Sequence, residues 1–156
     1  MACVLVASTP EASWLPSGST AEVWVGQDCP TPSPAIIVRL LLLRGETFFC
    51  VSSPKGLDLP TLFLGSGAER LTATEGLRQL LQRTLSQPDV AVRCVGYVRN
   101  VAPEPDADYP HPTPDAYVPV FAVDDAVKPV VPGEWIGVHA NLNERHWWPI
   151  AVHAVR

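Results

Sequence analysis

The chain has 156 residues, of which 47% are hydrophobic and 17% are charged, and its formal net charge is −5 at pH 7. This length and composition suit one soluble globular domain that spans residues 1–156 and buries a real core. The negative charge and the lack of a basic stripe argue against a nucleic-acid partner. The apolar runs are too short to span a membrane, so no membrane partner is expected.

Four cysteines, Cys3, Cys29, Cys50 and Cys94, occur without any C-x-x-C pair. Cys50 and Cys94 lie in apolar, strand-like runs, where a free cysteine behaves as a small hydrophobic residue. The first eight residues, MACVLVAS, have no positive flank and too short an apolar run for a signal peptide. We therefore expect a cytoplasmic location, with buried and reduced thiols.

The first half of the chain is predicted to form strands. Gly45-Glu46 indicates a tight turn between two of them, which are expected to pair as a hairpin. Pro60 lies inside the last extended segment, so that segment is expected to end or bend there. Alternating or branched apolar residues predict strands at 4–6 (a short edge strand), 20–25, 35–44, 47–52 and 57–64.

Residues 72–85 are predicted to form the strongest helix of the chain. Thr72 and Glu75 have the spacing of a capping box, in which each side chain bonds to the free backbone N–H of the other residue. Leucines recur at helical spacing through the segment and form one apolar stripe. Gly76 weakens the first turn by ~1 kcal/mol relative to alanine.

The second half of the chain is predicted to return to strands and to end in a short helical turn. Strands are expected at 90–101, 117–123 and 133–138, and Pro119 favours an edge position or a bulge for the second of these. Residues 149–155 suit a helical turn with proline at its first position. The order of elements predicts an α+β domain with a mixed sheet and helices outside it.

A glycine-rich turn at Gly65 comes directly before the predicted helix, and the residues from there to Ser86 resemble the signature of the Nudix hydrolase family. That signature is a glycine, five residues, Glu, seven residues, then Arg-Glu-aliphatic-any-Glu-Glu-any-Gly. With Gly65 as the first glycine and Ser86 at the last, only Gly65 and Leu81 fit the pattern. The resemblance covers about residues 35–150. It also rests on the order of elements and on Gly56-Leu57-Asp58-Leu59-Pro60 before the turn. It implies a Nudix-like α/β/α sandwich with a mixed β-sheet.

The family's glutamates hold Mg²⁺ against a diphosphate, and other residues stand at those positions here. The positions carry Leu71, Leu80, Arg83 and Thr84. Magnesium prefers hard oxygen ligands, usually one or two carboxylates together with phosphates and water. The resemblance and this deficit together predict that metal-assisted hydrolysis through the helix is lost. No cofactor and no metal site are then expected.

Gly65, Arg78, Arg83 and Tyr109 are the candidate ligand-binding residues. Arg78 and Arg83 can bind a phosphate without a metal, unless they are simply solvated cations. Tyr109 lies in the long proline-rich loop 100–115, which is either a lid over a ligand cleft, with Tyr109 stacked on a base, or a stiff surface loop. The expected ligand is a nucleotide or a phosphorylated small molecule.

No catalytic residue is assigned, and the candidates are Glu69, Asp106 and Asp108. Glu69 can reach a metal from the turn, and the two aspartates belong to the 100–115 loop. In this alternative the chain is an active Nudix hydrolase that uses Mg²⁺, held by acids outside the usual box. Its substrate is then a nucleoside diphosphate linked to another group.

The end of the chain contains three histidines spaced seven apart and a pair of tryptophans. His139, His146 and His153 can bind zinc only if they share a site, and a proline interrupts the segment. Trp147 and Trp148 either pack the last segment against the sheet or form a partner surface. The partner surface gives a further hypothesis, a homodimeric interaction module.

Overall fold

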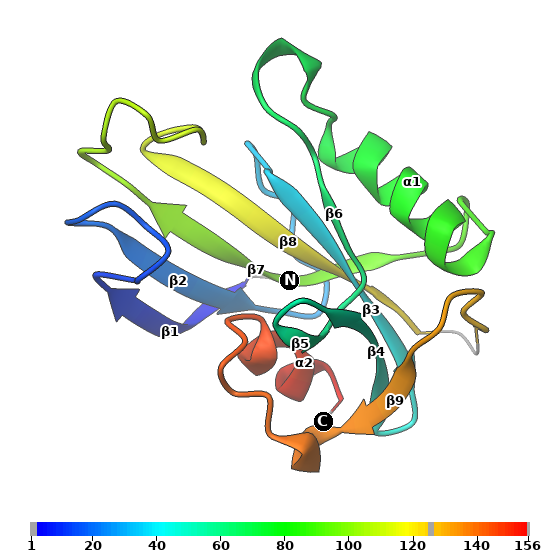
Figure 1. The fold of residues 1–156 in the computed structure, drawn as a ribbon. Helices are drawn as coiled ribbons and strands as arrows, with labels where there is room; N and C mark the ends of the chain where they lie inside the picture. Colours follow the sequence, from blue (N-terminus) through cyan, green and yellow to red (C-terminus); the bar gives the residue numbers. More distant parts are fainter. Residues whose placement is uncertain (1–2, 125–126, 156) are drawn as a thin grey trace.

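The structure, a computed structural model, describes residues 3–124 and 127–155. Within these residues the chain forms nine β-strands and two α-helices, which Figure 1 colours along the sequence. The strands are β1 (Val4–Pro10), β2 (Thr20–Val25), β3 (Ile37–Arg44), β4 (Thr47–Ser53), β5 (Gly56–Asp58), β6 (Thr61–Phe63), β7 (Arg93–Val101), β8 (Asp115–Val123) and β9 (Glu134–Gly137). The helices are α1 (Ala73–Leu85) and α2 (Trp148–Ala154), with the short 3-10 helices η1 (Gly67–Glu69) and η2 (Val138–Ala140).

The strands form one mixed sheet. They follow one another in the order β1, β2, β7, β8, β3, β4 and β5, with β6 paired to β3 and β9 paired to β4. β3 and β8 run parallel, with Arg39 opposite Val120, whereas β3 is antiparallel to β4 and β6. A parallel pair needs a long crossover connection, and the chain between β3 and β8, which includes α1, supplies it.

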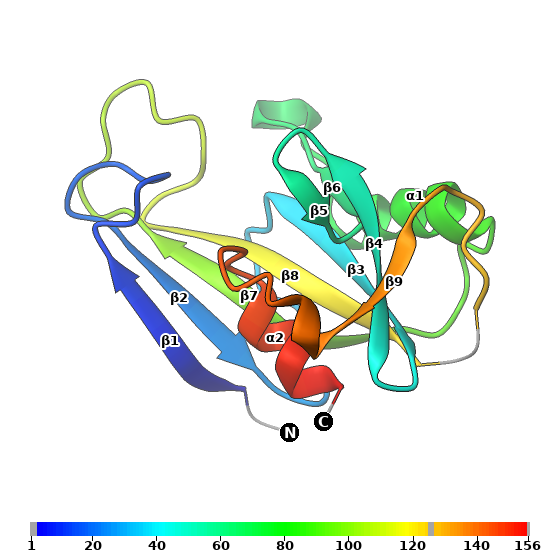
Figure 2. The same cartoon turned by 60° about the horizontal axis from the view of Figure 1, so that its bottom comes forward.

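The two helices cover opposite faces of this sheet. α1 contacts β3 and β6, whereas α2 contacts β2 and β7. Alternation along β3 sends Leu40 into the core beneath α1, and its neighbour Leu41 into the core that contains Trp147 and Ile150. The result is an α+β fold with α/β/α layers, which Figures 1 and 2 show from two directions.

The predicted helix is confirmed, together with its cap. Thr72 is the N-cap residue of α1: its hydroxyl accepts a hydrogen bond from the Glu75 N–H at 3.1 Å, and the Glu75 carboxylate accepts one from the Thr72 N–H at 2.9 Å. The expected break at Pro60 separates β5 from β6. The predicted edge strand extends to Pro10, and the final helical turn begins one residue early, at Trp148.

Pro119 does not lie in an edge strand, so that part of the prediction is wrong. β8 pairs with β7 on one side and with β3 on the other. The partner strand β7 does carry a bulge, but its register shifts between Cys94 and Gly96, opposite Phe121 and Val120, whereas Pro119 lies opposite Tyr97 in the regular part of the ladder.

Tyr117 donates its N–H to Pro34 on the β3 side, so alternation points the nitrogen of Pro119 to that side too. The Ile36 carbonyl there accepts the Leu64 N–H at 2.9 Å instead, so the missing N–H of Pro119 leaves no acceptor unpaired.

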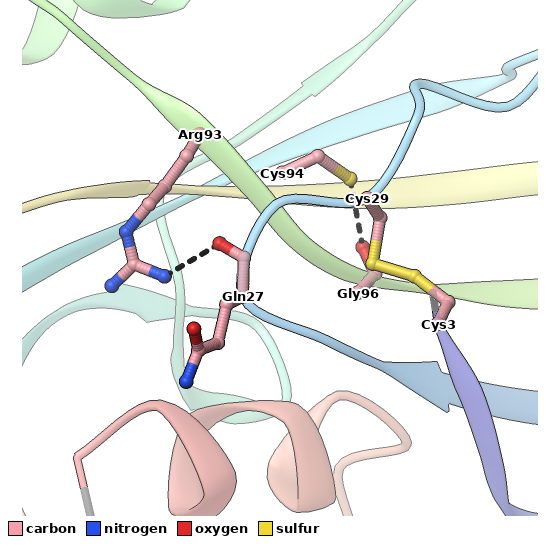
Figure 3. Close-up of a disulfide and its surroundings, with 6 residues drawn as sticks. All are labelled: Cys3, Gln27, Cys29, Arg93, Cys94 and Gly96. Atoms are coloured by element: carbon pink, nitrogen blue, oxygen red, sulfur yellow. Dashed lines mark hydrogen bonds between the residues drawn. A yellow bond between two sulfur atoms is a disulfide. The ribbon is translucent and has the colours of Figure 1, made fainter. Parts of the chain in front are cut away.

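Cys3 and Cys29 form a disulfide, so the expectation of reduced thiols is wrong for these two residues. The bond joins the start of β1 to the segment after β2, with the Cα atoms 5.7 Å apart, and Figure 3 shows it beside β7. Cys29 donates its N–H to the Cys94 carbonyl at 2.8 Å, which holds this segment against β7. Cys50 and Cys94 are free and buried, as predicted. Burial raises the pKa of the Cys50 thiol to about 12 and that of Cys94 to about 11.

In the part of the chain that the structure describes, no helix is long and apolar enough to cross a bilayer. α1 has 13 residues and α2 has 7, whereas a membrane span needs about 20. The cytoplasmic location expected from the sequence stays a prediction.

Candidate functional site

A cavity of about 400 Å³ lies between α1, β4 and the segment that leads into β9, and we call it the α1 cavity. Its walls come from the end of β4, the start of β6, the last turns of α1 and residues 131–133. The lining residues are Val51, Ser52, Pro60, Thr61, Leu80, Arg83, Thr84, Val131, Pro132 and Gly133.

The wall at residues 131–133 is held at both ends. Val130 donates its N–H to the Thr84 carbonyl at 2.8 Å, which satisfies one of the carbonyls left free at the end of α1. Glu134 pairs with Cys50 in the β4–β9 ladder. Gly133 permits this close approach, because a Cβ atom there would lie 2.4 Å from the Cys50 carbonyl oxygen. The backbone itself therefore positions this wall.

Leu80, Arg83 and Thr84 all face the α1 cavity. Residues spaced i, i+3 and i+4 share one side of a helix. These three residues stand where the Nudix resemblance aligns the family's helical glutamates. Leu80 and Thr84 are buried, whereas Arg83 is exposed and places its charge at the rim. A cation in the last turn of a helix is also favoured by the helix dipole.

The chemistry of this lining differs from that of a magnesium site. Among the described lining residues there is no carboxylate, and Arg83 carries the one formal charge. The hydroxyl groups of Ser52, Thr61 and Thr84 are the other polar side-chain groups. Mg²⁺ in proteins is usually held by one or two carboxylates, so the residues present do not fit this ion. Apolar walls with one cation suit an anionic ligand that has an apolar body.

Asp58 organises a buried polar network next to the α1 cavity. Its Oδ1 atom accepts hydrogen bonds from Arg39 Nη1 at 3.0 Å, Trp147 Nε1 at 2.7 Å and the Leu59 N–H at 2.8 Å. Arg39 also donates to the hydroxyl of Thr61 at 2.8 Å, and Thr61 lines the cavity. The Arg39 side chain is 8% exposed and that of Asp58 is 18% exposed. The carboxylate therefore serves to neutralise a buried cation.

Burial dominates the electrostatics of this network. It lowers the pKa of Arg39, because the loss of hydration outweighs the attraction to Asp58. Arg145 places a second guanidinium 3.8 Å from Asp58 Oδ2 and donates to the Leu57 carbonyl at 3.0 Å. Two cations thus share one carboxylate, and Arg39 Nε has no hydrogen-bond partner among the described residues. Removing that carboxylate would leave buried charge uncompensated.

Three of the predicted site residues lie near α1 but do not line the cavity. Gly65 opens the turn before the helix with φ of 92°, a conformation that favours glycine. Glu69 is exposed in η1. Arg78 forms an exposed ion pair with Asp89. Their proposed roles in binding or catalysis stay predictions.

The proline-rich loop folds against β6. The ring of Tyr109 packs edge-on to His111 with centroids 5.4 Å apart, and His111 packs on Phe63 at 6.1 Å. The Tyr109 hydroxyl is buried without a hydrogen-bond partner among the described residues. Asp106 and Asp108 are exposed. In the described chain, no three His, Cys, Asp or Glu side chains come close enough to hold a metal ion.

The three spaced histidines occupy different surroundings. His139 lies in η2 and His153 lies on α2, where it is exposed. His146 stacks on Trp14 with ring centroids 5.4 Å apart. Burial and the nearby positive charge of Arg39 lower the pKa of His146 to about 4.

The paired tryptophans pack the end of the chain against the sheet. Trp147 is fully buried and meets Phe48 edge-on with centroids 6.0 Å apart. Trp148 is half-buried and also contacts Phe48. The packing alternative is confirmed for Trp147, which cannot serve as an exposed partner surface. A homodimer stays a prediction.

Sequence reasoning missed two parts of this region. Arg39 interrupts an otherwise apolar strand, and a charge inside a buried strand signals a need for a buried partner. The wall at residues 131–133 gave no such signal, because its position depends on the hydrogen bond from Val130 to Thr84.

Comparison with known proteins supports the fold. No protein-family model matches the sequence, and no curated protein matches it. Among solved structures, the chain is similar to a crystal structure of the Bacillus subtilis pyrophosphohydrolase BsRppH, determined as a point mutant. The TM-score is 0.58 over 95% of this chain and 94% of that chain. Because the sequence identity is 8%, the likeness is one of fold alone. It agrees with the Nudix-like α+β architecture that the resemblance implied.

Proposed function

We propose that this chain binds an anionic small molecule, a nucleotide or another phosphorylated compound, in the α1 cavity, and that it does not hydrolyse pyrophosphate bonds with Mg²⁺. The observation that supports this proposal is the identity of Leu80, Arg83 and Thr84. These residues replace the family's carboxylates and line one cavity together.

Arg83 is the proposed anchor for the anion. A guanidinium group presents a planar set of N–H donors that matches two phosphate oxygens at once. Its place at the rim leaves the phosphate partly hydrated, so binding needs no full desolvation of either charge. The apolar walls around Leu80 and Val131 would then hold the uncharged part of the ligand.

The same residues argue against hydrolysis at this place. Metal-assisted attack on a phosphoryl group needs an ion that polarises the substrate or activates water. Leucine, arginine and threonine at the three helical positions supply no anionic oxygen for such an ion. The carboxylate of the nearby Asp58 already accepts hydrogen bonds from Arg39 and Trp147.

Thermal-shift measurements with ADP, ATP and ADP-ribose test the proposal. A ligand that binds only the folded protein raises the melting temperature. We expect at least one of these compounds to raise it equally in Mg²⁺ and in EDTA. A shift that requires Mg²⁺ would contradict the proposal.

Two arginine variants on the same helix give a matched comparison. Arg83→Gln removes the charge at the cavity rim, whereas Arg78→Gln removes a charge that is paired with Asp89 outside the cavity. A charge-assisted hydrogen bond contributes about 1.5–3 kcal/mol, so we expect Arg83→Gln to weaken binding by about tenfold or more. Arg78→Gln should bind as the wild type does. Equal losses in both variants would show that the ligand does not lie in the α1 cavity.

A further inference from the structure

The face of the sheet that α1 partly covers also carries a row of aromatic side chains, and this row lies outside the area that α1 covers. α1 contacts β3 and β6, and Figures 1 and 2 show β1, β2 and β7 extending away from it. Trp24 on β2 lies opposite Tyr97 on β7, with ring centroids 6.1 Å apart. Tyr97 meets Tyr117 on β8 at 5.5 Å. Tyr97 packs against the edge of the core beneath α1, and all three rings are half-buried.

Charged side chains border this aromatic row. Glu22 and Trp24 are two residues apart on one strand, so their side chains point to the same face. Arg99 lies opposite Glu22 and pairs with its carboxylate at 3.1 Å, and on the other side it pairs with Asp115 at 3.0 Å. Two carboxylates thus flank one guanidinium. Leu5 on β1 lies opposite Trp24 and is 47% exposed, which extends the apolar row.

We propose that this face binds a proline-rich segment of a partner protein that also carries basic residues. The face is defined by Leu5, Trp24, Tyr97 and Tyr117, with Glu22 and Asp115 at its border, and we call it the aromatic face.

Rows of Trp and Tyr suit proline-rich segments for a physical reason. Such segments form the polyproline II helix, which is preorganised and has no internal hydrogen bonds. Its proline rings pack on flat aromatic surfaces, and its free carbonyls accept hydrogen bonds from phenol donors. The indole N–H of Trp24 is already used, because it donates to Glu22 Oε1 at 3.1 Å, so Trp24 contributes its ring surface. Tyrosine and tryptophan provide large contact areas at a small cost in side-chain entropy.

Charge distinguishes a basic partner from two other occupants. The carboxylates of Glu22 and Asp115 flank the single guanidinium of Arg99, so the border carries one net negative charge, and the whole chain has a formal charge of −5. Single-stranded nucleic acid also stacks on aromatic side chains, but its backbone needs a cationic groove. The chain's own proline-rich residues 102–114 contain Glu104, Asp106 and Asp108 and no Lys or Arg. A second copy presenting this loop would therefore meet like charge.

Fluorescence anisotropy with a labelled peptide tests the proposal. The probe contains two Pro-Pro-Leu-Pro units followed by two arginines, and its matched control has glutamates in place of the arginines. We expect saturable binding of the basic probe and binding at least about tenfold weaker for the acidic control. A labelled single-stranded oligonucleotide should not bind.

Substitutions on the aromatic face locate the binding. Trp24→Ala should weaken binding of the basic probe by about tenfold or more. The milder Tyr97→Phe should also weaken this binding. Glu22→Gln should weaken binding of the basic probe several-fold. Trp135→Ala is the control, because Trp135 lies on β9, away from this face, and its ring stacks under the guanidinium of Arg44. Thermal unfolding of each variant confirms that it is folded.

Three outcomes would overturn the proposal. One is the absence of saturable binding of the basic probe by the folded wild-type protein. Another is equal binding by wild type and Trp24→Ala. The third is self-association, or oligonucleotide binding, that Trp24→Ala abolishes. Because the aromatic face and the α1 cavity share no lining residue, Arg83→Gln should leave peptide binding unchanged.

Discussion

A single carboxylate oxygen of Asp58 accepts hydrogen bonds from both Arg39 and Trp147, at 3.0 Å and 2.7 Å. Through this oxygen, β5 is joined to β3 at the centre of the sheet and to the residue that leads into α2. Trp147 is fully buried, so its indole N–H has to find a partner inside the protein. The network therefore has a structural role in fixing the last segment of the chain, beside a cavity that it does not supply with a free carboxylate.

Asp58→Asn should destabilise the fold strongly. The substitution removes the charge that balances Arg39, whose side chain is 8% exposed, and breaking a buried ion pair costs about 3–5 kcal/mol. Asp89→Asn is the matched control, because Asp89 pairs with Arg78 on the exposed surface, where such pairs contribute about 0–1 kcal/mol. Urea unfolding measures the free energy of unfolding of both variants. Equal losses in the two variants would contradict a buried role for Asp58.

Gly76→Ala should destabilise the protein although alanine is the better helix former. A Cβ atom at residue 76 would lie 2.1 Å from Leu64 Cδ2, and Leu64 is 1% exposed. Overpacking of this kind costs about 1–3 kcal/mol, against a gain in helix propensity of about 1 kcal/mol. We expect a lower urea midpoint. The loss should shrink in the Leu64→Ala background, where the clash is absent, and a rise in stability in the wild-type background would show that α1 tolerates the added methyl group.

Ser86→Gly should stabilise the protein. Ser86 ends α1 with φ of 56°, and the left-handed conformation costs residues other than glycine about 1–2 kcal/mol. Part of this gain is offset by the extra freedom of glycine in the unfolded chain, so we expect a gain of about 0.5–1 kcal/mol. Thermal unfolding measures it. Ser86→Ala retains a Cβ atom and should give no gain; an equal gain from alanine would point to a cause other than backbone conformation.

Stability should fall as the pH decreases from about 6.5 to about 4. Burial and the charge of Arg39 lower the pKa of His146 from 6.5 to about 4 in the folded state. Between these pH values the unfolded chain binds a proton on His146 that the folded chain does not. The loss of stability is therefore complete near the pKa of the folded state and absent above the pKa of the unfolded state. The full loss in the free energy of unfolding amounts to about 3 kcal/mol.

Urea unfolding of wild type and His146→Gln at pH 7 and pH 5 checks this dependence. The variant lacks the titrating group, so it should lose less stability on acidification. His153→Gln is the control, because His153 is exposed and its replacement should leave the pH dependence of the wild type intact. If His146→Gln and wild type lose the same stability, another group carries the acid sensitivity.

Local patterns predicted most of the fold. The capping box of Thr72 and Glu75, the leucine stripe of α1 and the alternation in β2 and β7 each depend on residues close in sequence. Pro60 also ends an element where it was expected to. Pro119 was misplaced, because the proline rule treats a strand alone, and the Ile36 carbonyl on its β3 side accepts the N–H of Leu64, a residue distant in sequence.

Long-range relationships could not be predicted from such patterns. The disulfide between Cys3 and Cys29 follows from the β1–β2 ladder, which brings Val4 opposite Val25 and so places the two cysteines together. The bonds from Arg39 and Trp147 to Asp58 link residues that no motif connects.

The candidate site was predicted in part. Arg83 was named from its position in the helix, and its cavity depends on where the segment at residue 130 attaches to Thr84. Arg78, five residues earlier, carries the same charge but pairs with Asp89. Charge alone therefore cannot identify the arginine that faces the cavity. The position of Arg83 on the same side of the helix as Leu80 and Thr84 does identify it.

Turnover of nucleoside-diphosphate derivatives tests the central proposal most directly. Phosphorus NMR would follow ADP-ribose and related compounds in the presence of the full chain with Mg²⁺ or Mn²⁺. We predict spectra that do not change beyond the enzyme-free blank, because Leu80, Arg83 and Thr84 give the cavity no carboxylate for the ion. Metal-dependent cleavage by the wild type that disappears in Glu69→Gln, or in Asp106→Asn combined with Asp108→Asn, would contradict the account and establish an active hydrolase.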